Sequence, residues 1–505
     1  MPITSLEVLS VGQPWPPACE KTRMEAYKDD RALLSGAHHD VFADIVRLIQ
    51  KDRRRTQTYI ALAHPRRIVK AFGDMVLGEA PTIKVKGVDE VEPSEGEDVE
   101  SPAQEQVESY VEEMDLLHEA HQSLVDMQSL GEGVLKVTLK DCGVAGLRPR
   151  ITATDPCIWY PVVSDEDKQD VVSHILAWTW DCKGEDRKTT RLLKAETHEP
   201  GIVTTYTGTI RGGKIDTLEL VAALDASGKP IANPVMTLVD ECLVVPMFNF
   251  RSTCDSTGTS DFNDLMPILA EMEVRLYLIA SILDKHSDPK LYGPRSLVEQ
   301  DPATGEAVAT NTDLILVDAD EKPPGYVTWE GQLTAAYHEL DFLAEQALFV
   351  MEATPAMFGN IQGTVTSGAA LKRLLIAPLM KASRLRNRLD VALTKALTLA
   401  SQLHATVEGS GAVVFSDVSI EWQDGLPEDP METATIHSLL VTSKIESIED
   451  AVRAVFGVEG DELVQRMARL DAAKPEPFSP PTSPRIVLGM PADGPLSPRE
   501  GDVTP

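Results

Sequence analysis

The chain has 505 residues, several times the length of a typical domain, so one undivided core is excluded and several packed units are expected. Hydrophobic residues make up 43% and charged residues 25%, which excludes wholesale disorder, collagen-like repeats and a disulfide-stapled mini-protein. The formal net charge of -32 excludes condensation of the whole chain onto phosphate, so any DNA contact should be local or weak. The alternative interpretation is that the acidity only confers solubility.

The N-terminal part predicts helices and an acidic insert. Residues 21–60 carry apolar positions at helical spacing, which indicates a helix or a helix pair, and their basic cluster at 51–55 is interpreted as a solvated face rather than a partner contact. Residues 87–135 contain fifteen acids and no Lys or Arg. We expect a surface loop through about Pro102 and then a helix whose carboxylates coat its exposed face.

A β-rich body is predicted between residues 133 and 250. Short runs with strand-like composition are separated there by Gly, Pro and Asp, at 134–139, 171–180, 202–207 and 243–250. Together with the flanking helices, these runs predict an α+β fold class.

Two long helices follow. Apolar residues recur in steps of three and four over 262–283, where Pro267 either kinks the helix or marks its start, and again over 333–350. The intervening residues 286–330 contain five prolines and one good strand, 313–317, which predicts a compact β-containing tip. The expected seam between the helices includes Leu269, Leu276, Leu283, Leu340 and Leu343.

An uncharged loop leads from the second helix into a basic one. Residues 354–366 contain two glycines and no charged side chain, and 367–404 predict a long helix that Pro378 bends. Over 367–395 this helix carries seven basic side chains against the single acid Asp390, in a chain that is acidic overall. The seven are Lys372, Arg373, Lys381, Arg384, Arg386, Arg388 and Lys395.

The C-terminal part predicts a strand pair around 413–422 and short helices over 430–473. The pattern Ser447-x-x-Asp450 is a helix-capping signal. From Lys474 onward the chain contains nine prolines, which predicts a disordered tail.

No catalytic or metal-binding motif is evident. A P-loop, a G-x-G-x-x-G turn after a strand and a G-x-S-x-G elbow are all missing from the sequence. His118 and His121 lack an evident third ligand, so solvated helix histidines are favoured over a metal site. The six cysteines form no C-x-x-C pair, which predicts buried free thiols in a reducing compartment. We also expect no membrane span, no secretory signal, no cofactor and no metal.

The order of these parts, over roughly residues 20–470, resembles the portal proteins of long-tailed bacteriophages. The most specific segment begins at Trp329-Glu330-Gly331, with Tyr337 and Leu340 in the helix that follows. It continues through Thr354-Pro355, Phe358-Gly359, the run 367–375, Pro378-Leu379 and Lys381. Weaker similarity lies at 69–81 and 422–427.

The resemblance implies a portal-type architecture. Its parts would be an N-terminal α/β wing at 1–260, stem helices at 261–285 and 331–353, a clip at 286–330, a tunnel loop at 354–366, a kinked helix with wing return strands at 367–429, a helical crown at 430–473 and a tail at 474–505. The acidic insert and the Pro-rich tail depart from the family pattern and have no implied role.

The resemblance also implies a function. Portal proteins form a homo-oligomeric ring, usually a dodecamer, at the capsid vertex, where double-stranded DNA is packaged, retained and ejected and head is joined to tail. The implied partners are the terminase at the clip, the head-completion adaptor, and the major capsid and scaffold proteins. The implied location is the virion, after assembly in the host cytoplasm. A non-ring head-tail adaptor or minor capsid protein is the alternative, and no catalysis is expected.

The neutral loop suits a DNA channel. A pore that passes duplex should not bind it tightly, because each fixed Lys or Arg contact to phosphate adds salt-dependent affinity. The expected DNA-facing residues are Gly359, Asn360, Gln362, Gly363, Thr364 and Thr366. An ordinary flexible connector is the alternative. The side chains of Lys372, Arg373, Lys381, Arg384 and Arg388 either approach DNA or pair with acids of a neighbouring subunit, and the acidic excess favours pairing.

Overall fold

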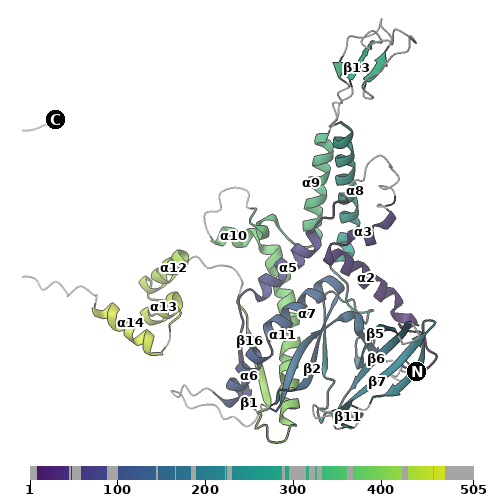
Figure 1. Cartoon of the computed structure of the whole chain (residues 1–505). Coiled ribbons are helices and arrows are strands. Elements are labelled where there is room, and N and C mark those ends of the chain that lie inside the picture. The colour runs from purple at the N-terminus through teal and green to yellow at the C-terminus, as the bar shows by residue number, and fades with distance from the viewer. Residues whose placement is uncertain are drawn as a thin grey trace, which may run out of the picture. The chain divides into compact units, whose positions relative to one another are not determined.

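The structure is a computed structural model. It describes residues 8–44, 47, 59–87, 101–143, 146–164, 166–183, 189–221, 223–224, 230–231, 233–286, 291–294, 314–317, 325–326, 333–360, 368–423, 430–458 and 460–472. The chain divides into two compact units, Met1–Pro427 and Glu428–Pro505. Helices and mainly antiparallel sheets both contribute, which confirms the α+β fold class (Figure 1).

Short helices open the first unit. A 3-10 turn at Ala18–Glu20 leads into α2 (Lys21–Ser35), and α3 (His38–Val41) follows, so of the two expectations, one helix or a helix pair, the described residues show the pair. Gly36 ends α2 with φ 88, a left-handed conformation that glycine adopts without steric cost. Next come α5 (His64–Leu77) and β1 (Thr82–Gly87). The basic cluster at 51–55 lies outside the described residues.

The second half of the acidic segment forms two helices, as expected. These are α6 (Pro102–Glu113) and α7 (Leu116–Leu130), and the first half, 88–100, lies outside the described residues. Most carboxylates of α6 are exposed, but Glu132 is completely buried, so the expected solvent-facing position is wrong for it. The hydroxyl of Tyr27 and the backbone N–H of Gly258, 2.9 Å away, donate hydrogen bonds to this carboxylate and make its burial possible.

Two antiparallel sheets form the β-rich body, at the predicted places. One has the order β12-β2-β3, from Val244–Phe248, Glu132–Asp141 and Leu147–Thr154. The other has the order β11-β7-β6-β5-β4, with β8 paired to β7. Its strands are β4 (Trp159–Val163), β5 (Val171–Lys183), β6 (Thr189–Glu199), β7 (Ile202–Arg211), β8 (Lys214–Leu220) and β11 (Val235–Met236). A 3-10 turn, Pro156–Ile158, precedes β4, and β9 (Ala223–Leu224) pairs with β10 (Pro230–Ile231).

The two long helices are α8 (Phe262–His286) and α9 (Leu333–Val350). Pro267 lies inside α8, whose start is therefore not displaced. Between them in the chain are β13 (Leu291–Pro294), β14 (Leu314–Val317) and β15 (Gly325–Tyr326), in the order β14-β13-β15, and β14 confirms the predicted strand. The guanidinium of Arg275 in α8 pairs with Glu339 in α9 at 3.0 Å.

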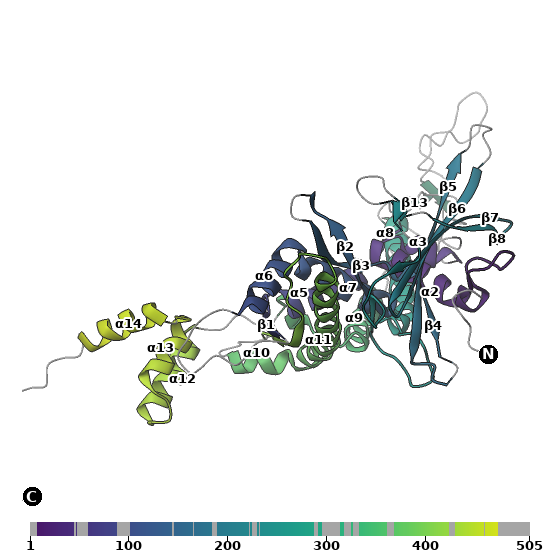
Figure 2. The ribbon, with the colours of Figure 1, turned by 90° about the horizontal axis from the view of Figure 1, so that it is seen from below.

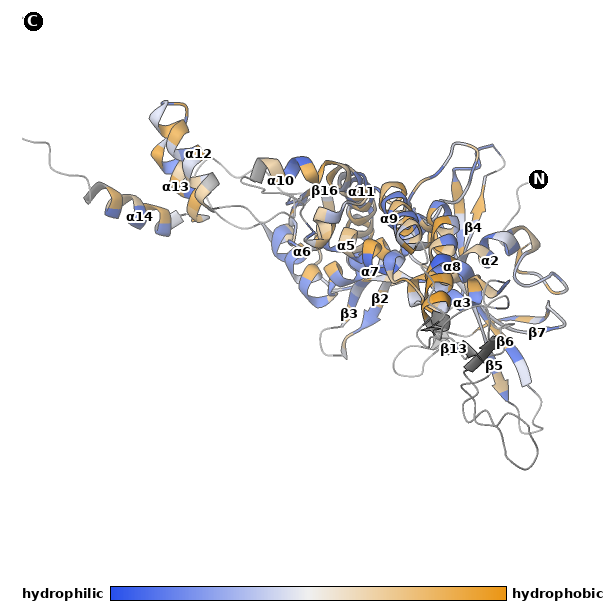
Figure 3. Ribbon diagram, turned by 90° about the horizontal axis from the view of Figure 1, so that it is seen from above, coloured by the Kyte–Doolittle hydropathy of each residue, from blue (hydrophilic) through white to orange (hydrophobic). Residues whose placement is uncertain are grey.

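The predicted seam between α8 and α9 is buried only at one end. Leu269 is inaccessible to solvent, whereas Leu276, Leu340 and Leu343 are half-buried and Leu283 is 47% exposed. The pair therefore buries its base and leaves apolar surface along the rest of its length. Figure 3 looks down on the two helices and shows hydrophobic residues in both.

The predicted basic helix is divided into α10 (Gly368–Leu374) and α11 (Ile376–Ala405). The break falls at Leu375 (φ -100, ψ 12), not at Pro378 itself, because Pro378 has no N–H to donate to the carbonyl four residues before it. A 3-10 turn, Pro355–Phe358, occupies the start of the segment predicted to be only loop.

The predicted strand pair after α11 is wrong. A single strand, β16 (Phe415–Glu421), pairs antiparallel with β1 from near the N-terminus, and no local signal identifies so distant a partner. The core of this unit surrounds α11, which packs against α5, α7, β2, β3, β12 and β16 (Figure 2).

The second unit consists of α12 (Pro430–Thr442), α13 (Ile448–Phe456) and α14 (Gly460–Ala472). The Ser447 hydroxyl accepts the Asp450 backbone N–H at 3.0 Å, which confirms the capping signal. A small core of Val452, Val458 and Leu463 joins α13 to α14, and residues 473–505 lie outside the described part of the chain.

All six cysteines are free, but the expectation that they are buried is wrong. Cys19, Cys142, Cys182 and Cys254 are exposed, and Cys157 and Cys242 are half-buried. Three of the exposed ones lie in turns or connections between elements, and Cys182 lies near the end of β5, where the sheet projects from the core.

Candidate functional site

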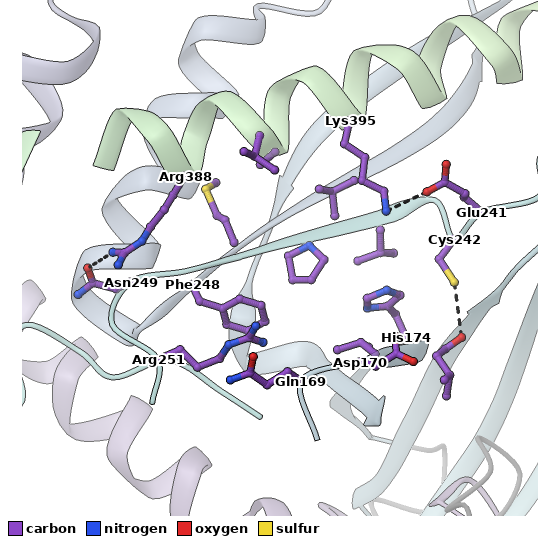
Figure 4. A pocket seen from close by; sticks show the side chains of 18 of the residues that line it. Gln169, Asp170, His174, Glu241, Cys242, Phe248, Asn249, Arg251, Arg388 and Lys395 are labelled. Carbon is purple, nitrogen blue, oxygen red and sulfur yellow. Dashed lines mark hydrogen bonds and ion pairs between the residues drawn. The ribbon is translucent and has the colours of Figure 1, made fainter. Parts of the chain in front are cut away.

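The basic face of α11 lines a cleft with a volume of about 950 Å³. Arg384, Arg388 and Lys395 share this face because they are spaced by four and seven residues. Strand β12 and the start of β5 form the opposite wall, and Arg251 follows β12 (Figure 4). The cleft therefore gathers four cations in a chain of strongly acidic composition.

Lys381 does not face this cleft, and it is 4% exposed. Its ammonium pairs with Asp261 at 2.7 Å, donates to the backbone carbonyl of Met351 at 3.1 Å and lies 4.7 Å from the ring centre of Phe72. Asp261 immediately precedes α8 and Met351 immediately follows α9, so one buried charge joins the adjacent ends of these helices to α11. This intrachain role differs from both roles expected for Lys381.

Other cations of α11 also find partners within the chain. Arg384 pairs with Glu352 at 2.6 Å and Lys395 with Glu241 at 2.9 Å. Arg386 donates to the backbone carbonyl of Met75 at 2.7 Å. The excess of acids thus neutralises part of this helix without a neighbouring subunit. On α10, Lys372 and Arg373 are exposed.

Arg388 and Arg251 are exceptions. Arg388 donates one long hydrogen bond, 3.4 Å, to the Asn249 side-chain carbonyl. Burial, and then the neighbouring charge of Arg384, lower the pKa of Arg388. The guanidinium of Arg251 lies 4.2 Å from the centre of the Phe248 ring, and its buried Nη1 has no hydrogen-bond partner within the described part of the chain. Neither guanidinium has a carboxylate within 4.0 Å among the described residues.

The floor of the cleft is uncharged and unreactive. The Trp159 indole N–H donates to Nδ1 of His174 at 3.0 Å, and burial lowers the pKa of His174 to about 3, so the imidazole is neutral. Burial raises the pKa of Cys242 to about 11, which keeps its thiol protonated. Such a site can bind an anion at its guanidiniums, but these two groups provide neither a strong base nor a nucleophile at neutral pH.

The second part of the predicted tunnel loop, 361–366, lies outside the described residues, and it includes Gln362, Gly363, Thr364 and Thr366. Gly359 ends the 3-10 turn with φ 77, and Asn360 is exposed. The Phe358 ring lies 5.8 Å from the guanidinium of Arg67 on α5, so this start of the loop is held against the body.

The two histidines considered as metal ligands have different partners within the chain. His118 hydrogen-bonds to Gln122 at 2.7 Å, and His121 lies 3.7 Å from Asp74. Among the described residues, no three His, Cys, Asp or Glu side chains gather as a metal site would require. Within the same residues, none of the helices is both long and apolar enough to cross a bilayer.

Sequence reasoning missed Arg251, Asn249 and Glu241 as members of this cleft. The local signal for Asn249 and Arg251 is the aromatic and basic run Phe248-Asn249-Phe250-Arg251 at the end of a strand, which suggests an exposed stacking site, and Glu241 lies outside that run. Comparison with protein-family models and with curated proteins finds no match for this chain.

Proposed function

We propose that this protein is a phage portal protein, which assembles into a ring-shaped channel for double-stranded DNA at the capsid vertex. The observation that carries the proposal is the order of α8, the three short strands β13–β15, α9, an uncharged segment and the interrupted helix α10–α11. In this assignment α8 and α9 are the stem, β13–β15 the clip, 354–366 the tunnel loop and α12–α14 the crown.

The surface of α9 supports self-assembly. Phe342 and Phe349 are spaced by seven residues on one face and are 58% and 76% exposed. On α8, Leu278 and Leu283 are 42% and 47% exposed. Large apolar side chains exposed in this number favour burial against another surface, and a ring of copies offers one on each flank.

The pairing of basic side chains within the chain supports passage of DNA without tight binding. Lys381, Arg384 and Lys395 are held in ion pairs within the chain, so they contribute little affinity for phosphate. The segment that would line the channel has no charged side chain. We propose no catalysis by this chain, and terminase, the head-completion adaptor, and the capsid and scaffold proteins as its partners in the virion.

Mass photometry and negative-stain microscopy of the purified full chain test the proposal. We expect closed rings with a central hole, and dodecamers as the main species. Monomers or small dimers alone, over a range of protein and salt concentrations that normally promotes assembly, would contradict it.

A deletion discriminates a portal from a non-ring adaptor. Removing residues 359–364 should leave ring formation intact and abolish packaging or retention of DNA, because only the channel wall is changed. Replacement of the same residues by a Gly/Ser linker of equal length is the matched control; it should also leave assembly intact and should restore most DNA passage. An adaptor would be indifferent to the deletion.

A further inference from the structure

The cleft beside α11 has no part in the proposed passage of DNA, yet it is built to receive an anion. It holds two half-buried guanidiniums, Arg388 and Arg251, for which the described residues supply no carboxylate partner. A half-buried guanidinium is costly without an acceptor, because its N–H groups lose water and gain little in return. An anion from outside would remove that cost.

The cleft is divided into a neutralised end and a cationic end. Figure 4 shows Lys395 paired with Glu241 on one side, and Arg388 and Arg251 on the other, with Phe248 between these two. Asp170 also lines the cleft. A duplex would present phosphates to these carboxylates as well as to the guanidiniums. A flexible acidic peptide can place its side chains only at the cationic end.

The apolar lining favours a polypeptide too. Val391 is 69% exposed on the α11 wall, between the turns that carry Arg388 and Lys395, and Val172 of β5 is 42% exposed. These side chains would cover the aliphatic parts of an extended chain. A run of carboxylates separated by short apolar residues therefore complements the cleft better than a phosphate backbone.

The chain itself contains such a run. Residues 88–100 carry seven carboxylates, no basic side chain and three valines. The segment is anchored at β1 and α6, which lie on the opposite side of α11 from β5 in two views (Figures 1 and 2). Thirteen residues held at both ends reach about 20 Å from their anchors, so the cleft of an adjacent copy is a more direct target than the cleft of the same copy.

We propose that the acidic segment 88–100 of one copy docks in the cleft between α11 and β12 of the next copy, where Arg388 and Arg251 bind its carboxylates. This inference rests on the proposed self-assembly and gives a role to an insert that the portal resemblance leaves without one. Each copy would present the segment on one flank and the cleft on the other, as a closed ring requires.

Peptide binding tests the cleft directly. The receptor is the full chain with every Asp and Glu of 88–100 changed to Asn or Gln, so that its own segment does not compete. The probe is a fluorescein-labelled peptide of residues 88–101, followed by anisotropy. We expect saturable binding that weakens as salt rises, and Arg388→Gln or Arg251→Gln should weaken it about ten-fold or more. Arg211→Gln is the matched control, since Arg211 is 85% exposed on β7 and outside the cleft, and it should change binding less than about two-fold.

Three results would overturn the docking. One is a peptide that does not bind, or that binds all variants alike. Another is a 20-base-pair duplex that binds more tightly than the peptide and loses its affinity in Arg388→Gln, which would assign the cleft to DNA. The third is peptide binding at the cleft while the acid-neutralised chain assembles as well as the unaltered chain, because the occupant would then not be a second copy.

The ring and the docking can fail separately. Closed rings formed by the Arg251→Gln/Arg388→Gln chain, with unchanged yield and stability, would overturn the docking and leave the proposed function standing. Cleft-dependent peptide binding and acid-dependent dimers, with no rings under any condition, would support the docking and contradict the portal function.

Discussion

Lys381 and Asp261 form an ion pair that is nearly closed to solvent, at the junction of three helices. Its partners come from positions more than a hundred residues apart, and only the three-dimensional fold brings them together. The sequence could therefore predict that Lys381 is a charged residue of a helix, but not which charge it meets. The same holds for Glu132, whose burial depends on Tyr27 and the Gly258 backbone.

Lys381→Met should lower the free energy of unfolding by about 3–5 kcal/mol, because it leaves the carboxylate of Asp261 buried without its cation. Urea denaturation at pH 7 measures the change. The double variant Lys381→Met/Asp261→Asn should recover part of the loss, since the amide introduced there still accepts a hydrogen bond from Asn249 and no charge is left. Arg373→Met on α10, an exposed position, is the control and should change the value by less than about 0.5 kcal/mol. Equal effects at 373 and 381 would contradict the assignment.

Three carboxyl groups with raised pKa values give the fold a dependence on pH. Burial raises the pKa of Asp30, Asp126 and Glu132 to about 7 each. Because the folded state holds these protons more tightly than the unfolded chain does, the stabilisation is complete below the unfolded pKa of about 4 and is lost as the pH rises through about 7. Wild-type stability should therefore decline between pH 4 and pH 7.

Asp30→Asn tests this dependence. It should reduce the decline by at most about 4 kcal/mol, which corresponds to a pKa raised from its ordinary value to about 7, and make the variant relatively more stable at pH 8 than at pH 5. Urea denaturation at both pH values measures the difference, with the exposed Glu25→Gln as control. Parallel pH profiles for the wild type and Asp30→Asn would show that Asp30 ionises normally in the fold.

At the scale of elements, the strongest apolar periodicities gave the most accurate predictions. The observed α9 has the predicted bounds, 333–350, and α8 begins at the predicted residue, because helix formation on one apolar face is a local property. Strand pairing is not local, which is why the pairing of β16 with β1 could not be predicted. The cleft was missed for the same reason, since its walls come from β5, β12 and α11.

The break between α10 and α11 should disappear in the Pro378→Ala variant. The alanine introduced there can donate its backbone N–H to the carbonyl of Leu374, which restores the hydrogen bond that proline removes and favours one continuous helix through Leu375. Hydrogen exchange of the amides at 375–380 should slow by about ten-fold or more, whereas the centre of α11, near Leu393, should be unchanged. Unaltered exchange at 375–380 would indicate that the loop before α10, not the proline, sets the break.

At the scale of the whole molecule, the two compact units should unfold independently of each other. The second unit has its own core of Val452, Val458 and Leu463, so the first should not depend on it for stability. A chain ending at Pro427 should unfold cooperatively, with a free energy of unfolding within about 1 kcal/mol of the first transition of the full chain. Calorimetry of both chains measures this. Loss of cooperative unfolding in the shorter chain would show that the units form one folding unit.

The junction at Lys381 has a mechanical consequence. The start of α8 and the end of α9 are tied to the same ammonium, and the segment that would meet DNA leaves α9 only a few residues later. If the proposed partners bind the strands between these helices, force applied there would be transmitted along α8 and α9 to this one contact. In the proposed portal, a load on the clip would therefore also reach the start of the tunnel loop, because the Lys381 side chain contacts both helices where they meet α11.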